Sequence, residues 1–345
     1  MRVIELHGKT GDSKIVLGES IEQLHSYCDI GNAVLVTDAN VRKVCESKFP
    51  KEIEVIEIDT GEGNKTFETV QLLYSRLLEL GFDRSSTVVG IGGGIVCDIA
   101  GFVATTYMRG TKLGFIPTTL LAQVDASIGG KNGVNFNGYK NIIGTFRQPD
   151  FVLCDFGLLA TLPERELRCG FAEIVKHGAI GDAALFAFLE GNHESACSLK
   201  KTAIEKVVHD SLIVKSKIVE RDETEHGERM KLNFGHTIGH AVEMIAGLPH
   251  GEAISIGMVA EAKLSVAKGM LTEKDAGRLR ALLENIGLPT IPSPKCDKTA
   301  IIDAIKKDKK KRNGGLRVVL LEGIGKAKVV ELTEEDLEVA IHDLC

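Results

Sequence analysis

Short hydrophobic runs alternate with longer segments of helical periodicity through the first part of the chain. The runs are rich in β-branched residues, as buried strands are, and they cover residues 33–37, 54–59 and 86–91. Each is followed by a segment whose apolar residues recur every three or four positions, at residues 41–49, 66–80 and 95–107. Strands and helices that alternate in this way form a parallel sheet covered by helices. The pattern therefore predicts an α/β domain.

The pattern changes after a last buried run at residues 151–155. Long helical periods then dominate, at residues 199–219, 236–245, 254–268 and 273–285. Two strand-like runs at residues 316–321 and 326–330 are separated by glycines, as in a hairpin. A chain of 345 residues exceeds what one hydrophobic core usually supports. We therefore predict an α/β domain over residues 1–158 and a mainly α-helical domain over residues 159–345.

A glycine-rich turn follows the third predicted strand, in the sequence Gly90-Ile-Gly-Gly-Gly-Ile-Val-Cys-Asp98. A strand that leads through glycines into a helix presents backbone amides and the positive end of the helix dipole, which suit a pyrophosphate. A tight strand-to-helix turn produces the same pattern, and the spacing is not the usual G-x-G-x-x-G. Asp38 and Asn40 follow the first strand, and Glu62 and Lys65 follow the second. These polar residues favour a nucleotide site at this edge of the sheet.

Three of the ten histidines fall within fifteen residues, at positions 236, 240 and 250. His236 and His240 are four residues apart, so on a helix their imidazoles project from one face and can reach one divalent cation. Glu173 lies in an otherwise apolar helical segment, where an unpaired carboxylate would be costly to bury. A solvated helix face or a pair of satisfied core histidines has the same spacing. On the residues alone, His236, His240 and Glu173 are candidate metal ligands.

Basic side chains stand among glycines and amides between residues 107 and 141. They include Arg109, Lys131 and Lys140. Most surface lysines are simply solvated, but in a chain with 48 acidic and 42 basic residues a local basic cluster favours an anion pocket. Later bases are candidates to join it: Lys176, Lys215, Arg229 and the pair Lys309 and Lys310. The last pair stands in a charge run that is also typical of a solvated helix face.

Composition excludes several classes of protein. A net charge of −6 makes nucleic acid a poor partner, and 43% hydrophobic with 26% charged residues is typical of a globular protein. The first residues lack the pattern of a signal peptide, and no apolar run is long enough to span a bilayer. The eight cysteines include no C-x-x-C pair. We expect a cytoplasmic protein with neither a membrane nor a nucleic-acid partner.

From about residue 34 to residue 325 the chain resembles the 3-dehydroquinate synthase family of sugar-phosphate cyclases. The resemblance rests on motifs in the same order: GGGIVCDIAGF, YMRG, PTTLLAQVDASIGGKNGVN, KNIIGTF, TLPERE, FAEIVK, RMKLNFGHTIGHAVE, HGEAISIGM and a late DKK. It implies a nucleotide-binding α/β domain and a mainly helical domain, with NAD+ and zinc or cobalt in the cleft between them, in a homodimer. The chain departs from the family pattern at Gly138-Tyr139 and at Asn132, where the family often has Leu-Gly and Thr, but it keeps the adjacent lysines.

Carried over residue by residue, the resemblance implies three sets of site residues. The metal ligands become Glu173, His236 and His250, while His240 contacts the substrate or relays a proton. The NAD contacts become Asp38, Asn40, Glu62, Lys65, Gly93, Gly94, Asp98, Thr118, Thr119, Lys131, Lys140, Thr161, Leu162 and Glu166. The substrate contacts become Asp125, Lys131, Lys140, Asn141, Lys176, Lys215, Arg229, Asn233 and one of Lys309 or Lys310, with Arg109 reaching in from the partner subunit.

The resemblance also implies a reaction. The substrate would be the seven-carbon sugar acid phosphate DAHP, which becomes 3-dehydroquinate and phosphate in the shikimate pathway. The implied steps are transient oxidation at C5 by NAD+, elimination of phosphate, reduction and aldol closure. Three other classes stay open: cyclases that make 2-deoxy-scyllo-inosose or 2-epi-5-epi-valiolone, a polyol dehydrogenase of the glycerol type, and a nucleotide-sensing binding protein. Arg229 and Asn233 favour the carboxylate-bearing substrate.

Overall fold

The computed structural model describes residues 1–292, 297–311 and 316–342, without the side chains of a few residues from 307 onwards. The chain divides into two compact units, Met1–Leu167 and Arg168–Cys345. This division lies nine residues after residue 158, at which the sequence pattern changes. Helix α4 (Glu164–Gly181) contains residues of both units.

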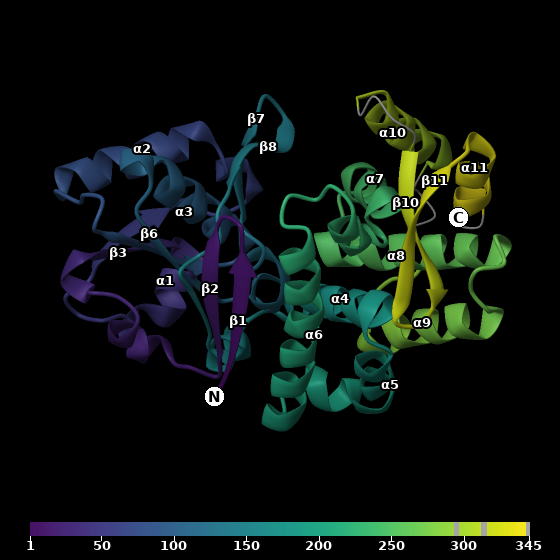
Figure 1. Ribbon diagram of the computed structural model, residues 1–345, viewed down its shortest axis with the longest axis horizontal. Helices are drawn as coiled ribbons and strands as arrows, with labels where there is room; N and C mark the ends of the chain where they lie inside the picture. The colour runs from purple at the N-terminus through teal and green to yellow at the C-terminus, as the bar shows by residue number, and fades with distance from the viewer. Residues whose placement is uncertain (293–296, 312–315, 343–345) are drawn as a thin grey trace. The chain divides into compact units, whose positions relative to one another are not determined.

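The first unit is built on a seven-stranded sheet in the order β1-β2-β9-β6-β5-β3-β4. Figure 1 labels its strands β1, β2, β3 and β6. The strands are β1 (Arg2–Gly8), β2 (Gly11–Leu17), β3 (Ala33–Asp38), β4 (Glu54–Ile58), β5 (Thr87–Gly92), β6 (Lys112–Pro117) and β9 (Phe151–Cys154). β1 and β2 are antiparallel, and all the other neighbouring pairs are parallel. The parallel sheet predicted from the sequence is confirmed.

Helices follow the strands of this sheet as the periodicity predicts. α1 (Ala39–Cys45) follows β3, α2 (Phe67–Glu79) follows β4, and α3 (Gly94–Thr106) follows β5. Every residue of β5 and β9 is buried, which shows that the middle of the sheet is covered on both faces. Because β3, β4 and β5 are parallel neighbours, the segments that follow them begin at the same edge of the sheet. This edge therefore carries the polar residues expected to bind a nucleotide.

Residues 131–146 form a separate two-stranded hairpin of β7 (Lys131–Phe136) and β8 (Tyr139–Phe146). The hydrophobic and helical patterns of the sequence do not predict this hairpin. Gly133 and Gly144 are partners across the two strands, and a β-carbon on Gly133 would lie 2.7 Å from the carbonyl oxygen of Ile143. These glycines therefore permit close pairing of two strands instead of a turn.

The second unit consists mainly of helices, as predicted. They are α4 (Glu164–Gly181), α5 (Ala183–Cys197), α6 (Lys201–Arg221), α7 (His236–Ala246), α8 (His250–Ala267), α9 (Glu273–Ile286), α10 (Lys298–Lys311) and α11 (Glu334–His342). The predicted hairpin is also present, as β10 (Leu316–Gly323) and β11 (Lys326–Leu332). Helix α8 is buried along most of its length, and its residues Ile256, Ala260 and Leu264 share a core cluster with Val318 and Leu320 of β10.

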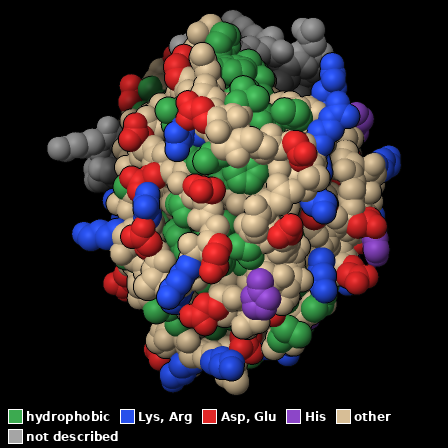
Figure 2. Space-filling model, turned by 90° about the vertical axis from the view of Figure 1, so that its left-hand side faces the viewer, with side chains coloured by type: hydrophobic (Ala, Val, Ile, Leu, Met, Phe, Trp, Pro, Cys, Tyr) green, Lys and Arg blue, Asp and Glu red, His purple; other side chains and the backbone are tan. Residues whose placement is uncertain are grey.

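Acidic and basic side chains are interspersed on the face of the molecule shown in Figure 2. This mixture agrees with the nearly balanced totals of 48 acidic and 42 basic residues. Among the described residues, none of the helices combines the length and the apolar character needed to cross a membrane.

Candidate functional site

Three side chains from three helices of the second unit form a cluster that can hold a metal ion. Glu173 lies in the middle of α4, His236 is the first residue of α7 and His250 is the first residue of α8. Oε1 of Glu173 lies 3.9 Å from Nε2 of His236 and 3.8 Å from Nε2 of His250. The structure thus brings together the three residues that the family resemblance implies as ligands.

The buried carboxylate of Glu173 is paired with a cation on one side only. Its side chain is 0% exposed, and within the described part of the chain neither of its oxygens accepts a hydrogen bond. Lys176, which lies three residues further along α4 and is also buried, forms an ion pair with Oε2. Oε1, on the other side of the carboxylate, faces the two imidazoles. A buried carboxylate oxygen without a donor is costly, so a cation at this point would stabilise it.

Hydrogen bonds set which ring nitrogen of each histidine faces Glu173. Nδ1 of His236 lies 3.1 Å from the carbonyl oxygen of Phe234, and Nδ1 of His250 lies 3.0 Å from Oε2 of Glu243. Because both partners only accept, each Nδ1 carries the proton and donates it. Burial, followed by the nearby Lys176 and His250, lowers the pKa of His236 well below its usual value, which keeps this imidazole neutral. Each Nε2 therefore presents a lone pair to Glu173.

The donor set fits a divalent metal ion. The carboxylate oxygen lies 3.8–3.9 Å from each of the two nitrogen lone pairs, which is too long for hydrogen bonds, and all three ligand atoms lie within 4.8 Å of one another. In a tetrahedral zinc site with bonds of about 2.0–2.1 Å, neighbouring ligand atoms lie roughly 3.4 Å apart, so the two oxygen-to-nitrogen distances need to shorten by only about half an ångström. Two neutral imidazoles and one carboxylate are ordinary ligands of catalytic zinc.

His240 stands beside this cluster on the exposed side of α7. Its ring centroid is 5.0 Å from that of His236 and 5.8 Å from that of His250. His240, Glu243 and His250 also form a second, overlapping group with metal-ligand spacing. The spacing argument from sequence pairs His236 with His240, whereas the family resemblance pairs His236 with His250, so the two differ in the second imidazole ligand.

Glycines let the helices of the cluster approach one another. A β-carbon on Gly239 of α7 would lie 2.9 Å from the carbonyl oxygen of Ala253 in α8, and one on Gly251 of α8 would overlap Cys169 of α4. Gly235 has a φ of 80°, a left-handed conformation that glycine adopts without strain, and it ends the turn before α7. The glycines next to the histidine motifs are thus helix-to-helix contacts.

Sequence reasoning overlooked Glu261, a residue of α8 whose side chain is 0% exposed. The backbone N–H of Gly235, the N-cap residue of α7, donates to Oε2 of Glu261 at 2.6 Å. Glu261 therefore accepts a hydrogen bond at the start of this helix, where Gly235 has no side chain to act as a cap. Burial raises the pKa of Glu261 to about 8, although backbone hydrogen bonds oppose the shift. A lone acid in the apolar run of residues 253–262 is the signal that could have identified it.

In the first unit, a polar network joins four residues expected at the nucleotide and substrate sites. The buried Lys65 forms an ion pair with Asp98 of α3 and donates to the side-chain oxygen of Asn141 in β8. Burial raises the pKa of Asp98 to about 6, and Lys65 opposes that shift. Asn135 of β7, which sequence reasoning missed, donates to Oε1 of Glu62 at 2.8 Å and accepts from the N–H of Asn141 at 2.8 Å. No sequence spacing distinguishes Asn135 from other strand residues.

The glycine turn provides the features of a phosphate site. Gly93 is the N-cap residue of α3. Because it has no side chain to accept a hydrogen bond, the backbone N–H groups at the start of α3 are available to an anion. A β-carbon on Gly93 would lie 3.2 Å from the Thr119 side chain, and Thr118 donates its N–H to Gly92 at the end of β5. Asp38 has a local role as well, because its carboxylate caps α1 through the N–H groups of Asn40 and Val41.

The remaining expected site residues differ in exposure. Lys176, Lys215 and Arg229 are buried, whereas Asp125, Asn233, Leu162 and Gly94 are partly buried. The exposed ones are Arg109, Lys131, Lys140, Asn141, Thr161 and Glu166. Arg109 follows Met108, and both have positive φ angles, 67° and 51°, which is unusual for residues with side chains. The prediction for Lys309 or Lys310 lies outside the side chains that the structure describes.

Asp222, another residue that the sequence did not reveal, folds the loop that carries Arg229. Its carboxylate accepts the N–H groups of His226, Gly227 and Arg229 at 2.9, 2.7 and 3.0 Å. These bonds contribute to a lowered pKa of Asp222, against the opposing effect of burial. In the same loop, Asn233 donates to Oε1 of Glu225 at 2.6 Å.

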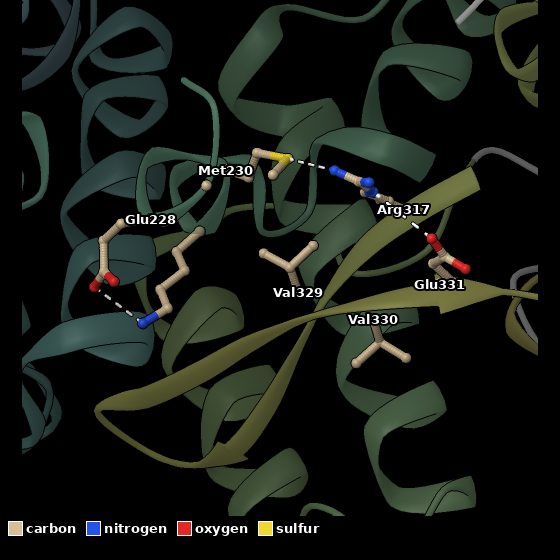
Figure 3. A pocket seen from close by; sticks show the side chains of 8 residues that line it. Glu228, Met230, Arg317, Val329, Val330 and Glu331 are labelled. Carbon is tan, nitrogen blue, oxygen red and sulfur yellow. Dashed lines mark hydrogen bonds and ion pairs between the residues drawn. The ribbon is translucent and has the colours of Figure 1, made fainter. Parts of the chain in front are cut away.

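A surface pocket in the second unit lies beside the same loop (Figure 3). It is lined by Gly227, Glu228, Met230, Lys231, Arg317, Val329, Val330 and Glu331. Lys231 pairs with Glu228. Figure 3 shows Arg317 in contact with the sulfur of Met230. Among the side chains that the structure describes, none of the expected site residues lines this pocket, so its position does not mark the chemistry.

Comparison with known proteins gives the family. Residues 55–169 match the family described as 3-dehydroquinate synthase N-terminal, and residues 170–311 match 3-dehydroquinate synthase C-terminal. A 3-dehydroquinate synthase from Pelobacter propionicus is 40% identical over 333 residues, which cover 96% of this chain and 89% of the relative.

Two solved structures with bound ligands are also similar to this chain. The 2-epi-5-epi-valiolone synthase of Streptomyces hygroscopicus subsp. jinggangensis 5008, with NAD+ and Zn2+ bound, is 32% identical with a TM-score of 0.88, over 100% of this chain and 99% of that one. A 2-deoxy-scyllo-inosose synthase complexed with carbaglucose-6-phosphate, NAD+ and Co2+ is 27% identical with a TM-score of 0.90, over 100% of both chains. Since the sequence match spans both units and the fold is shared, this chain belongs to the 3-dehydroquinate synthase family.

Proposed function

We propose that this enzyme converts DAHP into 3-dehydroquinate and phosphate, with NAD+ and a divalent metal ion, zinc or cobalt, as cofactors. The observation that carries the proposal is the set of Glu173, His236 and His250, which presents one carboxylate oxygen and two imidazole lone pairs to a common point. The metal would act as a Lewis acid toward the substrate hydroxyls, and NAD+ would accept and return a hydride.

The basic side chains suit the two anionic groups of this substrate. Lys131 and Lys140 belong to the β7–β8 hairpin, and Lys176, Lys215 and Arg229 belong to the second unit. A sugar acid phosphate carries a carboxylate and a phosphate, and charge-assisted hydrogen bonds to each would orient it for reaction. We assign His240, which is exposed beside the metal cluster, to proton transfer or substrate contact.

The nucleotide would lie at the carboxyl edge of the parallel sheet. The uncapped start of α3 after Gly93 suits a pyrophosphate, and the network of Glu62, Lys65 and Asp98 supplies polar groups for the rest of the cofactor. Asp38, Asn40, Thr118 and Thr119 stand at the ends of neighbouring strands of the same edge.

Release of inorganic phosphate tests the proposed reaction. The purified chain, supplied with NAD+ and zinc, should release phosphate from DAHP and produce 3-dehydroquinate without net formation of NADH. A cyclase of the 2-deoxy-scyllo-inosose type would instead release phosphate from glucose 6-phosphate, which has no carboxylate. A polyol dehydrogenase would accumulate NADH, and a binding protein would bind NAD+ and turn over none of these substrates.

We further propose that the chain acts as a homodimer in the cytoplasm. Two consecutive non-glycine residues with positive φ, Met108 and Arg109, form an exposed turn, and such backbone strain is often kept where a residue has a function. Arg109 would reach the site of the partner subunit. The thiols of Cys97 and Cys154 are buried in the sheet unit, as in proteins of reducing compartments. Sedimentation equilibrium gives the assembly state directly.

A further inference from the structure

We infer that Glu243 is a positioning residue for the metal centre, which holds the His250 imidazole so that Nε2 faces Glu173. The inference rests on the proposed metal site and adds to it a residue outside the three ligands. Glu243 stands on α7, and its Oε2 lies 3.0 Å from Nδ1 of His250 at the start of α8. Nε2 of the same ring lies 3.8 Å from Glu173.

The two histidines are held in different ways. His236 is 13% exposed and donates to a backbone carbonyl, that of Phe234, so its orientation follows from the fold of the chain itself. His250 is 30% exposed and donates to a side chain. A ring with that much freedom can rotate about its side-chain torsions and present either nitrogen. The orientation of His250 therefore depends on Glu243 more than that of His236 depends on any one side chain.

The geometry separates a positioning role from direct ligation. His240, Glu243 and His250 also have metal-ligand spacing, so Glu243 is in principle a ligand. The 3.0 Å separation from Nδ1 is, however, a hydrogen-bond distance, and the carboxylate of Glu243 is 16% exposed beside that nitrogen. Since the two ring nitrogens point in different directions, a proton on Nδ1 leaves Nε2 as the metal-binding atom.

Removal of such a partner typically weakens metal binding by about 10–100-fold. We therefore expect Glu243→Ala to lower the zinc affinity of the metal-stripped full chain by about that factor, measured by competition with a chromophoric chelator. Glu243→Gln retains an oxygen that accepts from Nδ1 and should bind zinc within about threefold of the unsubstituted chain. The matched control is Met244→Ala, because Met244 is the next residue of α7 and is 69% exposed.

Each outcome has a distinct meaning. If Glu243→Ala binds zinc as tightly as the unsubstituted chain, the inference is wrong. If Glu243→Gln binds zinc as weakly as Glu243→Ala, Glu243 acts as a ligand or through its charge, and the positioning role is also wrong. Should Glu243→Ala fail to fold, Glu243→Asp replaces it, because the shorter carboxylate keeps the charge but not the reach, and binding weaker than in Glu243→Gln supports positioning.

The same titration keeps this inference separate from the proposed function. If the unsubstituted chain and His250→Ala bind zinc equally, the proposed metal site is wrong whatever Glu243 does. If the unsubstituted chain binds zinc at His250 but releases no phosphate from DAHP, the proposed reaction is wrong while the role of Glu243 stands or falls on the affinities alone.

Discussion

A β-carbon on Gly257 of α8 would overlap the backbone carbonyl oxygen of Gly235, which comes directly before α7. The two helices therefore meet at a glycine-to-glycine contact, one residue before His236 and on the helix that begins with His250. The spacing between two candidate metal ligands is thus set by backbone contact between their helices. Helices that meet through side chains can shift slightly as those side chains change rotamer, whereas helices in direct backbone contact cannot move closer together.

Gly257→Ala should separate α7 from α8 and weaken zinc binding. Overpacking of a tight contact costs about 1–3 kcal/mol of stability, and we expect zinc affinity to fall as well because His236 moves with α7. Gly277→Ala is the control: Gly277 lies in α9 with open space around its Cα, so the alanine should stabilise the helix by up to about 1 kcal/mol. Urea unfolding and a zinc titration of both variants check this. Equal behaviour of the two variants would contradict the contact argument.

His250→Ala should abolish stoichiometric zinc binding and turnover while NAD+ still binds. The reason is that the alanine removes one of two imidazole lone pairs at the cluster, and the nucleotide residues belong to the other unit. Metal analysis after dialysis and calorimetric titration with NAD+ measure the two effects separately. His25→Ala, at an exposed position in the first unit, serves as the control. Full zinc content in His250→Ala would remove His250 from the ligand set.

The sequence specifies the sheet and the long helices because their signals are local. β-branched runs predict β3, β4 and β5, and helical periodicity predicts α2, α3 and α9 to within a few residues. The β7–β8 hairpin escapes such reasoning, because Gly133 and Gly144 are explained by contact across the two strands, and only Gly138 lies in the turn. Contacts between residues distant in sequence produce no periodic pattern of hydrophobic and polar residues from which they could be predicted.

The same limit applies to the candidate site. Spacing of four residues draws attention to His236 and His240, but only the packing of α4, α7 and α8 shows that His250 also faces Glu173. The family resemblance supplies that pairing in advance, and periodicity does not. Glu243 and Asn135 are visible only through their hydrogen-bond partners.

The pH dependence of stability should differ between Asp98→Asn and the unsubstituted chain. Burial raises the pKa of Asp98 from its usual 3.8 to about 6, so between these values the folded state keeps a proton that the unfolded state has lost. The contribution of Asp98 to the free energy of unfolding is therefore largest below pH 3.8 and decreases as the pH rises to about 6. Asparagine removes this term, so the stability of the unsubstituted chain minus that of Asp98→Asn should decrease over this window.

Asp83→Asn provides a control of opposite sign for that experiment. Hydrogen bonds from Ser85 lower the pKa of Asp83, so its contribution is present above pH 3.8 and is lost as the pH falls. The stability of the unsubstituted chain minus that of Asp83→Asn should therefore increase with pH. Urea unfolding at several pH values, from below 3.8 for Asp83 up to 7 for Asp98, measures both differences, and slopes of the same sign, each within its own pH window, would contradict the argument.

Lys131→Ala should raise the KM for DAHP and slow turnover. Loss of a charge-assisted hydrogen bond to an anion costs about 1.5–3 kcal/mol, which corresponds to at least about tenfold in kcat/KM. Lys201→Ala is the matched control, because its side chain is 87% exposed at the start of α6 and belongs to no proposed site. Steady-state phosphate release measures both variants. Unchanged constants for Lys131→Ala would exclude this lysine from the anion site.

Asn135→Ala should weaken both NAD+ and DAHP binding, although we expect Asn135 to contact neither. Its amide joins Glu62, expected at the nucleotide, to Asn141, expected at the substrate. Asn141 has a φ of 54°, and the hydrogen bond from its N–H to Asn135 helps to hold this unusual backbone conformation. Two lost hydrogen bonds of about 1 kcal/mol each predict a several-fold rise in both the Kd for NAD+ and the KM for DAHP.

Zinc affinity should stay unchanged in Asn135→Ala because the metal cluster belongs to the other unit. Asn192→Ala, which removes an exposed helix side chain, should change none of the three constants. If Asn135→Ala raised only one of the two constants, the amide would support that ligand alone and the coupling through Asn135 would be wrong.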